Sequence, residues 1–246
     1  EEQQRCENTE IAERGKIYAH DSIEEEGSLY PLSFDVKTYQ IWVVPRQITD
    51  KKKVASELAN VIGISGPEIF DKINNDKLYI PPIKKGLDYD SAQQVKSKNF
   101  AGLLIIPENS RYYPENNLAS HLLGFVNSEG KGNYGFEGHY DKELQGTSGS
   151  ISGEKDTLGN VISLLDQKKA EDGTSYVLTI DRSVQYFVEK KLKEAITKYQ
   201  ADSGTVVIMD IEAGGIVAMA SMPDYNPNSF RQVAADNPGL FVNPAI

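Results

Sequence analysis

A serine followed three positions later by a lysine (S-x-x-K) can form a catalytic pair, because the lysine amine can accept the serine proton. The pattern occurs twice, at Ser128 to Lys131 and at Ser152 to Lys155. With 19 serines and 20 lysines in the chain, one or two such matches are expected by chance. The chemistry needs the serine at the start of a helix, whereas both matches lie in glycine-rich sequence. We therefore assign no catalytic residue to this chain.

Metal and phosphate sites also have recognisable spacings. His20, His121 and His139 have no second His or Cys two to four positions away, so we expect structural or surface roles for all three. A Walker-type phosphate loop is absent from the sequence, because Gly130-Lys131-Gly132 lacks the leading glycine and the following Ser or Thr. The sequence therefore predicts no metal and no cofactor.

Charge and composition exclude other classes of protein. The 246 residues hold 26 Lys and Arg against 36 Asp and Glu, which gives a net charge of −10 and argues against a nucleic-acid partner. No apolar run is longer than five residues, far short of the ~18 that cross a bilayer. Because the sequence starts at Glu1 without a leader, we expect that a signal or anchor precedes it or was removed.

The segment up to about residue 110 reads as mixed α and β structure. Asp50 can cap a helix with a single apolar face that ends at Gly63, and Ser65 with Glu68 resembles a capping box for the next helix. A run rich in β-branched and aromatic residues ends at Pro45. The elements expected here are strands over residues 36–44, 78–80 and 101–106 and helices over 51–62 and 67–73.

Residues 124–173 are rich in glycine, which predicts loops and short hairpins. Near the start of the chain, Glu24 to Glu26 predict a solvated turn. One hairpin is well defined, because residues 150–154 and 161–165 can pair across a turn that contains Gly159 and Asn160. We place a domain boundary near residue 172.

After that boundary the sequence predicts a strand over residues 175–180, a helix capped by Asp181, and a hairpin of strands 205–211 and 216–222. The helix should carry one apolar stripe and ion pairs of Glu189 with Lys193 and of Glu194 with Lys198. Both hairpin strands are almost continuously apolar, which predicts burial on both faces. One helix covers only one face, so a partner for the other must come from elsewhere. The stripe comprises Val184, Phe187, Val188, Leu192, Ala195, Ile196 and Tyr199.

Several short motifs follow one another in a fixed order. They are R-G-K-I with Arg14 and Gly15, R-Y-Y-P with Arg111, Tyr113 and Pro114, H-L-L-G with His121 and Gly124, G-F-E with Gly135 and Glu137, D-x-x-x-Q with Asp181 and Gln185, and P-D-Y-N-P-N from Pro223 to Asn228. In this order and spacing they resemble the class B penicillin-binding proteins, membrane-anchored DD-transpeptidases that cross-link peptidoglycan. The resemblance implies structural roles for these residues. Glu137 is expected to anchor buried backbone donors or Arg14.

The resemblance implies an α+β fold with two parts: an elongated mixed α/β pedestal or dimerisation domain over residues 1–172, and an incomplete transpeptidase domain of a helix plus antiparallel strands over 173–246. The family's catalytic S-x-x-K follows the P-D-Y-N-P-N stretch and is not reached by Ile246. The parent enzyme would act on D-Ala-D-Ala stem peptides and be acylated by β-lactams. The pedestal would bind a polytopic glycosyltransferase and other cell-wall proteins at the extracytoplasmic face of the membrane.

Two alternatives stay open at this point. The chain could be a catalytically inactive cell-envelope module, binding or regulatory, that kept the pedestal. It could also be a cytosolic α+β enzyme unrelated to cell walls, which would need a catalytic constellation that the sequence does not show. The residues immediately after Ile246 would discriminate best between these readings.

Overall fold

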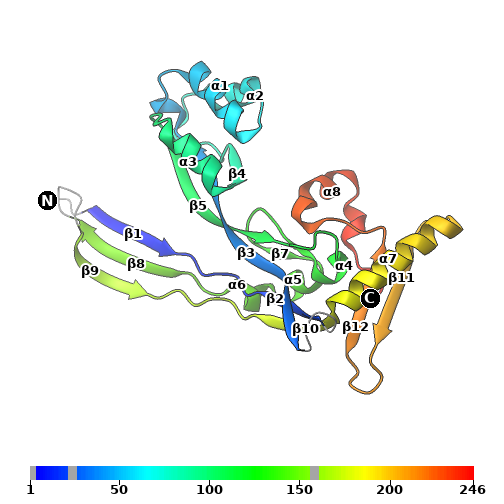
Figure 1. Ribbon diagram of the computed structural model, residues 1–246. Coiled ribbons are helices and arrows are strands. Elements are labelled where there is room, and N and C mark those ends of the chain that lie inside the picture. Colours follow the sequence, from blue (N-terminus) through cyan, green and yellow to red (C-terminus); the bar gives the residue numbers. More distant parts are fainter. Residues whose placement is uncertain (1–3, 22–26, 156–160) are drawn as a thin grey trace. The chain divides into compact units, whose positions relative to one another are not determined.

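The computed structural model describes residues 4–21, 27–155 and 161–246 (Figure 1). Its contacts divide the chain into two compact units, residues 36–110 and residues 1–35 with 111–246. Both units mix helices with mainly antiparallel strands, which confirms the predicted α+β class. The boundary predicted near residue 172 concerns a family domain and stays a prediction. Among the described residues, no helix is both long enough and apolar enough to cross a membrane.

The smaller unit packs three helices against a sheet of three strands. Strand β3 pairs with β4 and with β5, and its buried Ile41 belongs to one core with Leu58 of α1 and Ile69 of α2. The elements are β3 (Ser28–Val43), α1 (Lys51–Ile62), α2 (Gly66–Ile73), β4 (Lys84–Leu87), α3 (Tyr89–Ser97) and β5 (Leu103–Tyr112).

Both predicted caps are confirmed in this unit. The Asp50 carboxylate accepts from Lys53 N at 3.0 Å, and Ser65 Oγ accepts from Glu68 N at 3.4 Å. The strand predicted over residues 78–80 is wrong, because this segment is irregular and its Leu78 side chain is exposed. Two prolines follow directly and supply no amide hydrogen for strand pairing.

The larger unit holds several small sheets. Strands β1, β8 and β9 form an antiparallel sheet, and in a second sheet β10 runs parallel to β2, which pairs antiparallel with β3 (Figure 1). The predicted hairpin is confirmed as β8 and β9, while its turn at residues 156–160 and the turn at 24–26 lie outside the described residues. The strands are β1 (Gln4–Glu10), β2 (Ile17–Asp21), β6 (Phe125–Val126), β7 (Gly132–Asn133), β8 (Gly149–Lys155), β9 (Val161–Lys168) and β10 (Tyr176–Asp181).

One core of this unit joins segments far apart in sequence. Ile17 from β2, Leu144 and Ile180 are all buried in it. Glycine allows the backbones to meet: a Cβ on Gly15 would lie 1.9 Å from Thr174 O, and one on Gly173 would lie 1.7 Å from Leu144 O. The short helices here are α4 (Ser120–Leu123), α5 (Gly135–His139) and α6 (Asp141–Gln145).

The end of the chain forms α7 (Arg182–Tyr199), β11 (Gly204–Met209), β12 (Ile216–Met222) and α8 (Phe230–Asp236). Asp181 caps α7 as predicted, by accepting from Val184 N at 2.9 Å. Val188 packs against Ala218 and Ala220 of β12, with Val184 and Leu192 partly buried beside them. The predicted stripe is wrong for Phe187 and Tyr199, which are exposed.

The two strands of the last hairpin differ in burial. β12 is buried, whereas β11 exposes Val207, Ile208 and Met209, which agrees with the expectation that one helix leaves part of this apolar hairpin without a partner. The face expected to lack a partner therefore lies on β11. The predicted ion pairs along α7 are also wrong: Glu194 pairs with Lys191, and Glu189 accepts from uncharged donors.

Candidate functional site

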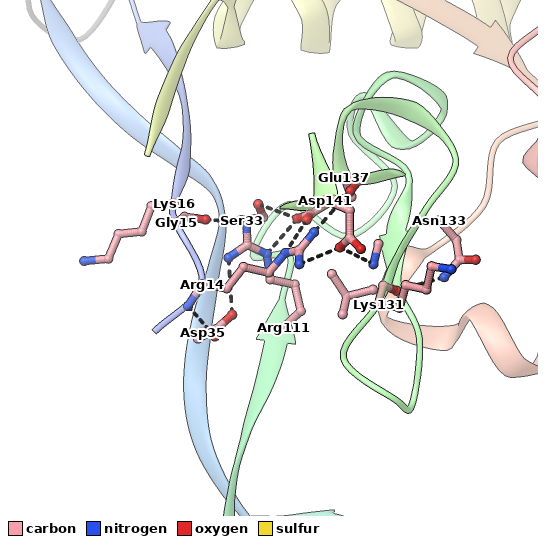
Figure 2. A network of polar contacts seen from close by, with 12 residues as sticks. Arg14, Gly15, Lys16, Ser33, Asp35, Arg111, Lys131, Asn133, Glu137 and Asp141 are labelled. Carbon is pink, nitrogen blue, oxygen red and sulfur yellow. Dashed lines mark hydrogen bonds and ion pairs between the residues drawn. The ribbon is translucent and has the colours of Figure 1, made fainter. Parts of the chain in front are cut away.

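Glu137 of α5 lies at the centre of a buried polar cluster (Figure 2). Its carboxylate accepts from Arg14 Nε at 2.8 Å and from Arg111 Nε at 2.7 Å. Ser33 Oγ donates to the same carboxylate at 3.2 Å, and the Tyr113 hydroxyl donates at 3.4 Å. Glu137 itself is fully buried, so four donors from three separate parts of the chain converge on one charge that water does not reach.

Two further carboxylates complete the cluster. Arg14 Nη1 donates to Asp141 at 2.8 Å, and Arg111 Nη1 donates to Asp35 at 3.2 Å. Each guanidinium also donates to a backbone carbonyl: Arg14 to Glu137 O at 3.1 Å and Arg111 to Gly15 O at 2.8 Å. Two cations thus face three anions, and planar guanidinium groups suit this multiple bonding.

The electrostatics favour a fixed protonation state. Burial alone lowers the pKa of Arg111, but Glu137, Tyr113 and Asp35 outweigh it and the net pKa is raised. Burial and the nearby Glu137 raise the Tyr113 pKa well above 10. Arg111 therefore stays charged and Tyr113 stays neutral near pH 7, and the raised pKa makes each of them a poorer proton donor. The cluster is suited to holding segments together.

Two family-motif glycines shape the loop that carries Glu137. Gly124 and Gly135 have positive φ angles of +75° and +46°. A Cβ at Gly124 would lie 2.2 Å from Tyr134 O, and one at Gly135 would lie 2.5 Å from Leu122 O. Both positions therefore require glycine for conformation and for space.

The segment after β12 binds to the R-Y-Y-P motif. The Asn228 side chain accepts from Tyr113 N at 3.1 Å and donates to Tyr113 O at 2.9 Å, directly before the turn that starts at Pro114. The Tyr225 hydroxyl donates to Ser120 O at 2.9 Å. Side chains near the end of the chain thus form hydrogen bonds with the backbone of motifs from its middle.

His121 adds a further contact in this region. Its Nε2 lies 3.0 Å from Leu240 O, and its ring meets the Tyr225 ring edge to face at 5.2 Å. Burial lowers the pKa of His121, although the contact with the Leu240 carbonyl partly opposes the shift. The contacts of His121 are therefore those of a buried histidine that packs between neighbouring segments, which agrees with the structural role expected from the sequence.

Gln185 of α7 binds the backbone of β12. Its amide accepts from Met219 N and donates to Met219 O, both at 2.8 Å, and it also donates to Glu189 at 2.7 Å. Glu189 accepts from Ala119 N at 2.8 Å. Burial raises the Glu189 pKa, partly opposed by these two hydrogen bonds. The side chains of Gln185 and Glu189 therefore tie α7 to both β12 and the segment before α4.

The structure gathers most of the predicted residues into these contacts. Asp181 instead caps α7, Pro114 starts the turn after β5, and Pro223 lies exposed after β12. The motifs did not identify Ser33, Asp35, Asp141 or Glu189 as site residues. A polar residue at every second position of a strand is a signal for Ser33 and Asp35, because alternate side chains share one face.

Among the described residues, no group of three or more His, Cys, Asp or Glu side chains is arranged so that it could hold a metal ion. Ser128 lies in a turn, where its Oγ is 2.6 Å from Arg231 Nη2, and Ser152 lies on β8. Neither serine starts a helix, as the sequence predicted.

Comparison with known proteins identifies related chains. Residues 9–178 match the Penicillin-binding Protein dimerisation domain. Peptidoglycan D,D-transpeptidase FtsI of Escherichia coli strain K12 is 31% identical over 81% of this chain, and Stage V sporulation protein D of Bacillus subtilis is 28% identical over 90%. The chain covers 35% and 34% of these two relatives, so it spans about a third of their length.

Solved structures show the same fold. A peptidoglycan synthetase from Bifidobacterium adolescentis is 26% identical over 91% of this chain and 45% of its own, with a TM-score of 0.57. The penicillin-binding protein PBP2 of Helicobacter pylori, solved in complex with MreC, is 20% identical over 99% of this chain and 48% of its own, with a TM-score of 0.68.

Proposed function

The chain belongs to the family of the penicillin-binding protein dimerisation domain, and from this premise we propose that it is the scaffold and partner-binding pedestal of a peptidoglycan D,D-transpeptidase. The observation that carries the proposal is the convergence of three motif segments, at Arg14, Arg111 and Glu137, on one buried carboxylate. Such a cluster fixes the relative positions of segments and performs no chemistry. Relatives whose names describe D,D-transpeptidases support the wider assignment.

Within this proposal, residues 1–172 are the pedestal and residues 173–246 begin the transpeptidase domain. The motif residues act structurally: Asp181 and Gln185 fix α7, and Asn228 fastens the later segment to Tyr113. The exposed apolar side chains of β11 fit a catalytic domain of which this chain holds only the first elements.

The catalytic serine of the whole protein would lie outside residues 1–246. It would attack the D-Ala-D-Ala end of a stem peptide, with a paired lysine accepting its proton, and the acyl group would pass to an amine of a second stem. β-Lactams would acylate the same serine. Fluorescent penicillin should therefore label the full-length gene product covalently and leave residues 1–246 unlabelled. Stoichiometric labelling of residues 1–246 would overturn the assignment, and an unlabelled full-length product would favour an inactive envelope module.

The partners proposed are a polytopic glycosyltransferase and other cell-wall synthesis proteins, at the extracytoplasmic face of the membrane with an N-terminal anchor. The MreC complex of the Helicobacter pylori protein supports a partner-binding role for a chain of this fold. Affinity purification of the full-length protein from membranes tests this proposal. Recovery of cell-wall synthesis proteins is expected, and their absence from a preparation that retains an intact protein would contradict it.

A further inference from the structure

An apolar groove runs along α1 and α2 in the smaller unit. Its volume is about 470 Å³, within the ~300–1,000 Å³ of typical binding pockets. One face of α1 supplies one wall, since the lining residues recur at helical spacing, and the start and middle of α2 supply the other. The lining residues are Lys52, Ala55, Ser56, Ala59, Asn60, Gly66, Pro67 and Phe70.

The groove is open because the side chains along it are small. Ala55, Ala59 and Gly66 leave space that Phe70 only partly fills. A Cβ added at Gly66 would find its nearest atom at 3.9 Å, which is ordinary contact, and Gly66 has no positive φ. Neither packing nor backbone conformation therefore requires glycine here. A larger residue at this position would cover part of the groove.

The one charged residue among those that line the groove is a lysine, Lys52. The first turn of α1 holds three consecutive lysines and no acidic residue, although a helix N-terminus favours negative charge. Lys51 is engaged by Asn75 O and Asp76, whereas Lys52 lines the groove and is paired with no carboxylate of the described residues. Residues 36–110 hold 11 basic against 8 acidic residues, a net charge of +3, while the rest of the chain holds 15 against 28.

We propose that this groove binds an acidic amphipathic helix of a partner protein. The apolar stripe of the helix would lie on Ala59, Pro67 and Phe70, and a carboxylate at its edge would pair with Lys52. Ser56 and Asn60 supply uncharged hydrogen-bonding groups on the same wall. The proposal rests on the partner-binding function proposed above, and it specifies where on the chain a partner binds and what chemistry it presents.

A peptide titration tests the groove directly. The probe is a fluorescein-labelled helical peptide of about 18 residues, long enough to be helical alone, with leucines on one face and glutamates beside them. Fluorescence anisotropy with residues 1–246 should show saturable binding. A second peptide with lysine in place of each glutamate should bind about tenfold or more weakly, and the difference should shrink at high salt. Equal binding of both peptides would overturn the acidic preference.

Three variants locate the site. Ala59→Trp fills the groove and should weaken binding of the glutamate peptide by about tenfold or more, while Lys52→Glu should weaken it about five- to tenfold. Lys96→Glu is the matched control, because it makes the same charge change on an exposed position of α3 and should leave the affinity unchanged. Circular dichroism verifies folding of each variant. If Lys96→Glu weakens binding as much as Lys52→Glu, or if folded Ala59→Trp binds normally, the groove is not the site.

Failure of the groove proposal can be distinguished from failure of the proposed transpeptidase function. Penicillin labelling of the full-length product depends on a serine outside this chain and not on the groove. A chain that fails to bind the peptide would therefore remove the groove proposal and leave the transpeptidase assignment in place.

Discussion

Replacing Glu137 by alanine removes the acceptor that four buried donors share. Arg14 keeps Asp141 and Arg111 keeps Asp35, so both guanidinium groups retain one carboxylate each. Both Nε groups, the Ser33 hydroxyl and the Tyr113 hydroxyl lose their acceptor. The expected result is a fold that persists with a marked loss of stability.

The size of the loss follows from the burial. Arg14, Arg111 and Glu137 have side chains that are only 6%, 2% and 0% exposed, so water cannot replace the lost acceptor without local opening. Breaking a buried ion pair by removing one partner costs about 3–5 kcal/mol. For a chain of this size each kcal/mol lowers the melting temperature by about 2–4 °C, so we expect a decrease of about 6–20 °C. Glu137→Gln should lose less, because one amide oxygen still accepts while the NH₂ group faces a donor.

Thermal unfolding followed by circular dichroism measures the decrease, and hydrogen exchange locates it. Amides of residues 132–146 should lose protection first, since this loop carries Glu137 and Asp141. Glu129→Ala is the control: its side chain is exposed in a nearby turn, and its removal should change stability by no more than about 0.5 kcal/mol. A Glu137→Ala melting temperature within about 2 °C of the wild-type value would refute a stabilising role of the cluster.

Three further outcomes are expected. Gln185→Ala leaves the buried Met219 N and O without their partner and should cost about 2–4 kcal/mol in a denaturant titration, whereas exposed Gln93→Ala should cost almost nothing. Burial raises the pKa of Glu189 in the folded protein, so ionisation of this carboxyl opposes folding. The destabilisation is absent at a pH below the pKa of Glu189 in the unfolded chain, and it is complete at a pH above its pKa in the folded protein. Glu189→Gln should therefore raise the melting temperature at pH 7 by a few degrees, with a gain that vanishes toward pH 4, and a gain that is constant with pH would contradict the argument. Amides of residues 174–246 should exchange faster than those of the preceding part, most of all along β11, and equally slow exchange in both would count against an incomplete domain.

The sequence predicted those elements whose signals are local. Asp50 and Asp181 mark helix starts through hydrogen bonds within three residues, and Gly63 ends α1 in the left-handed conformation, as expected from the sequence. The strand predicted at residues 78–80 failed because the following prolines outweigh the local apolar character. The contacts of Glu137 with Ser33 and Arg111 could not be derived from spacing, because they join residues 104 and 26 positions apart. The resemblance led us to expect that Glu137 contacts Arg14, and the structure confirms this contact, whereas Ser33 and Asp35 were not expected in the cluster.

The hydrogen bonds of Gln185 determine which edge of the last hairpin can pair with a further strand. One edge of β12 pairs with β11, and on its other edge Gln185 occupies Met219 N and O while Thr179 Oγ1 donates to Ile216 O at 2.8 Å. In the described part of the chain, β11 pairs with no strand other than β12. Any additional strand can therefore join this sheet only along β11, whose apolar side chains are already exposed. The same edge makes the isolated chain prone to self-association, so a covering segment would improve both its folding and its solubility.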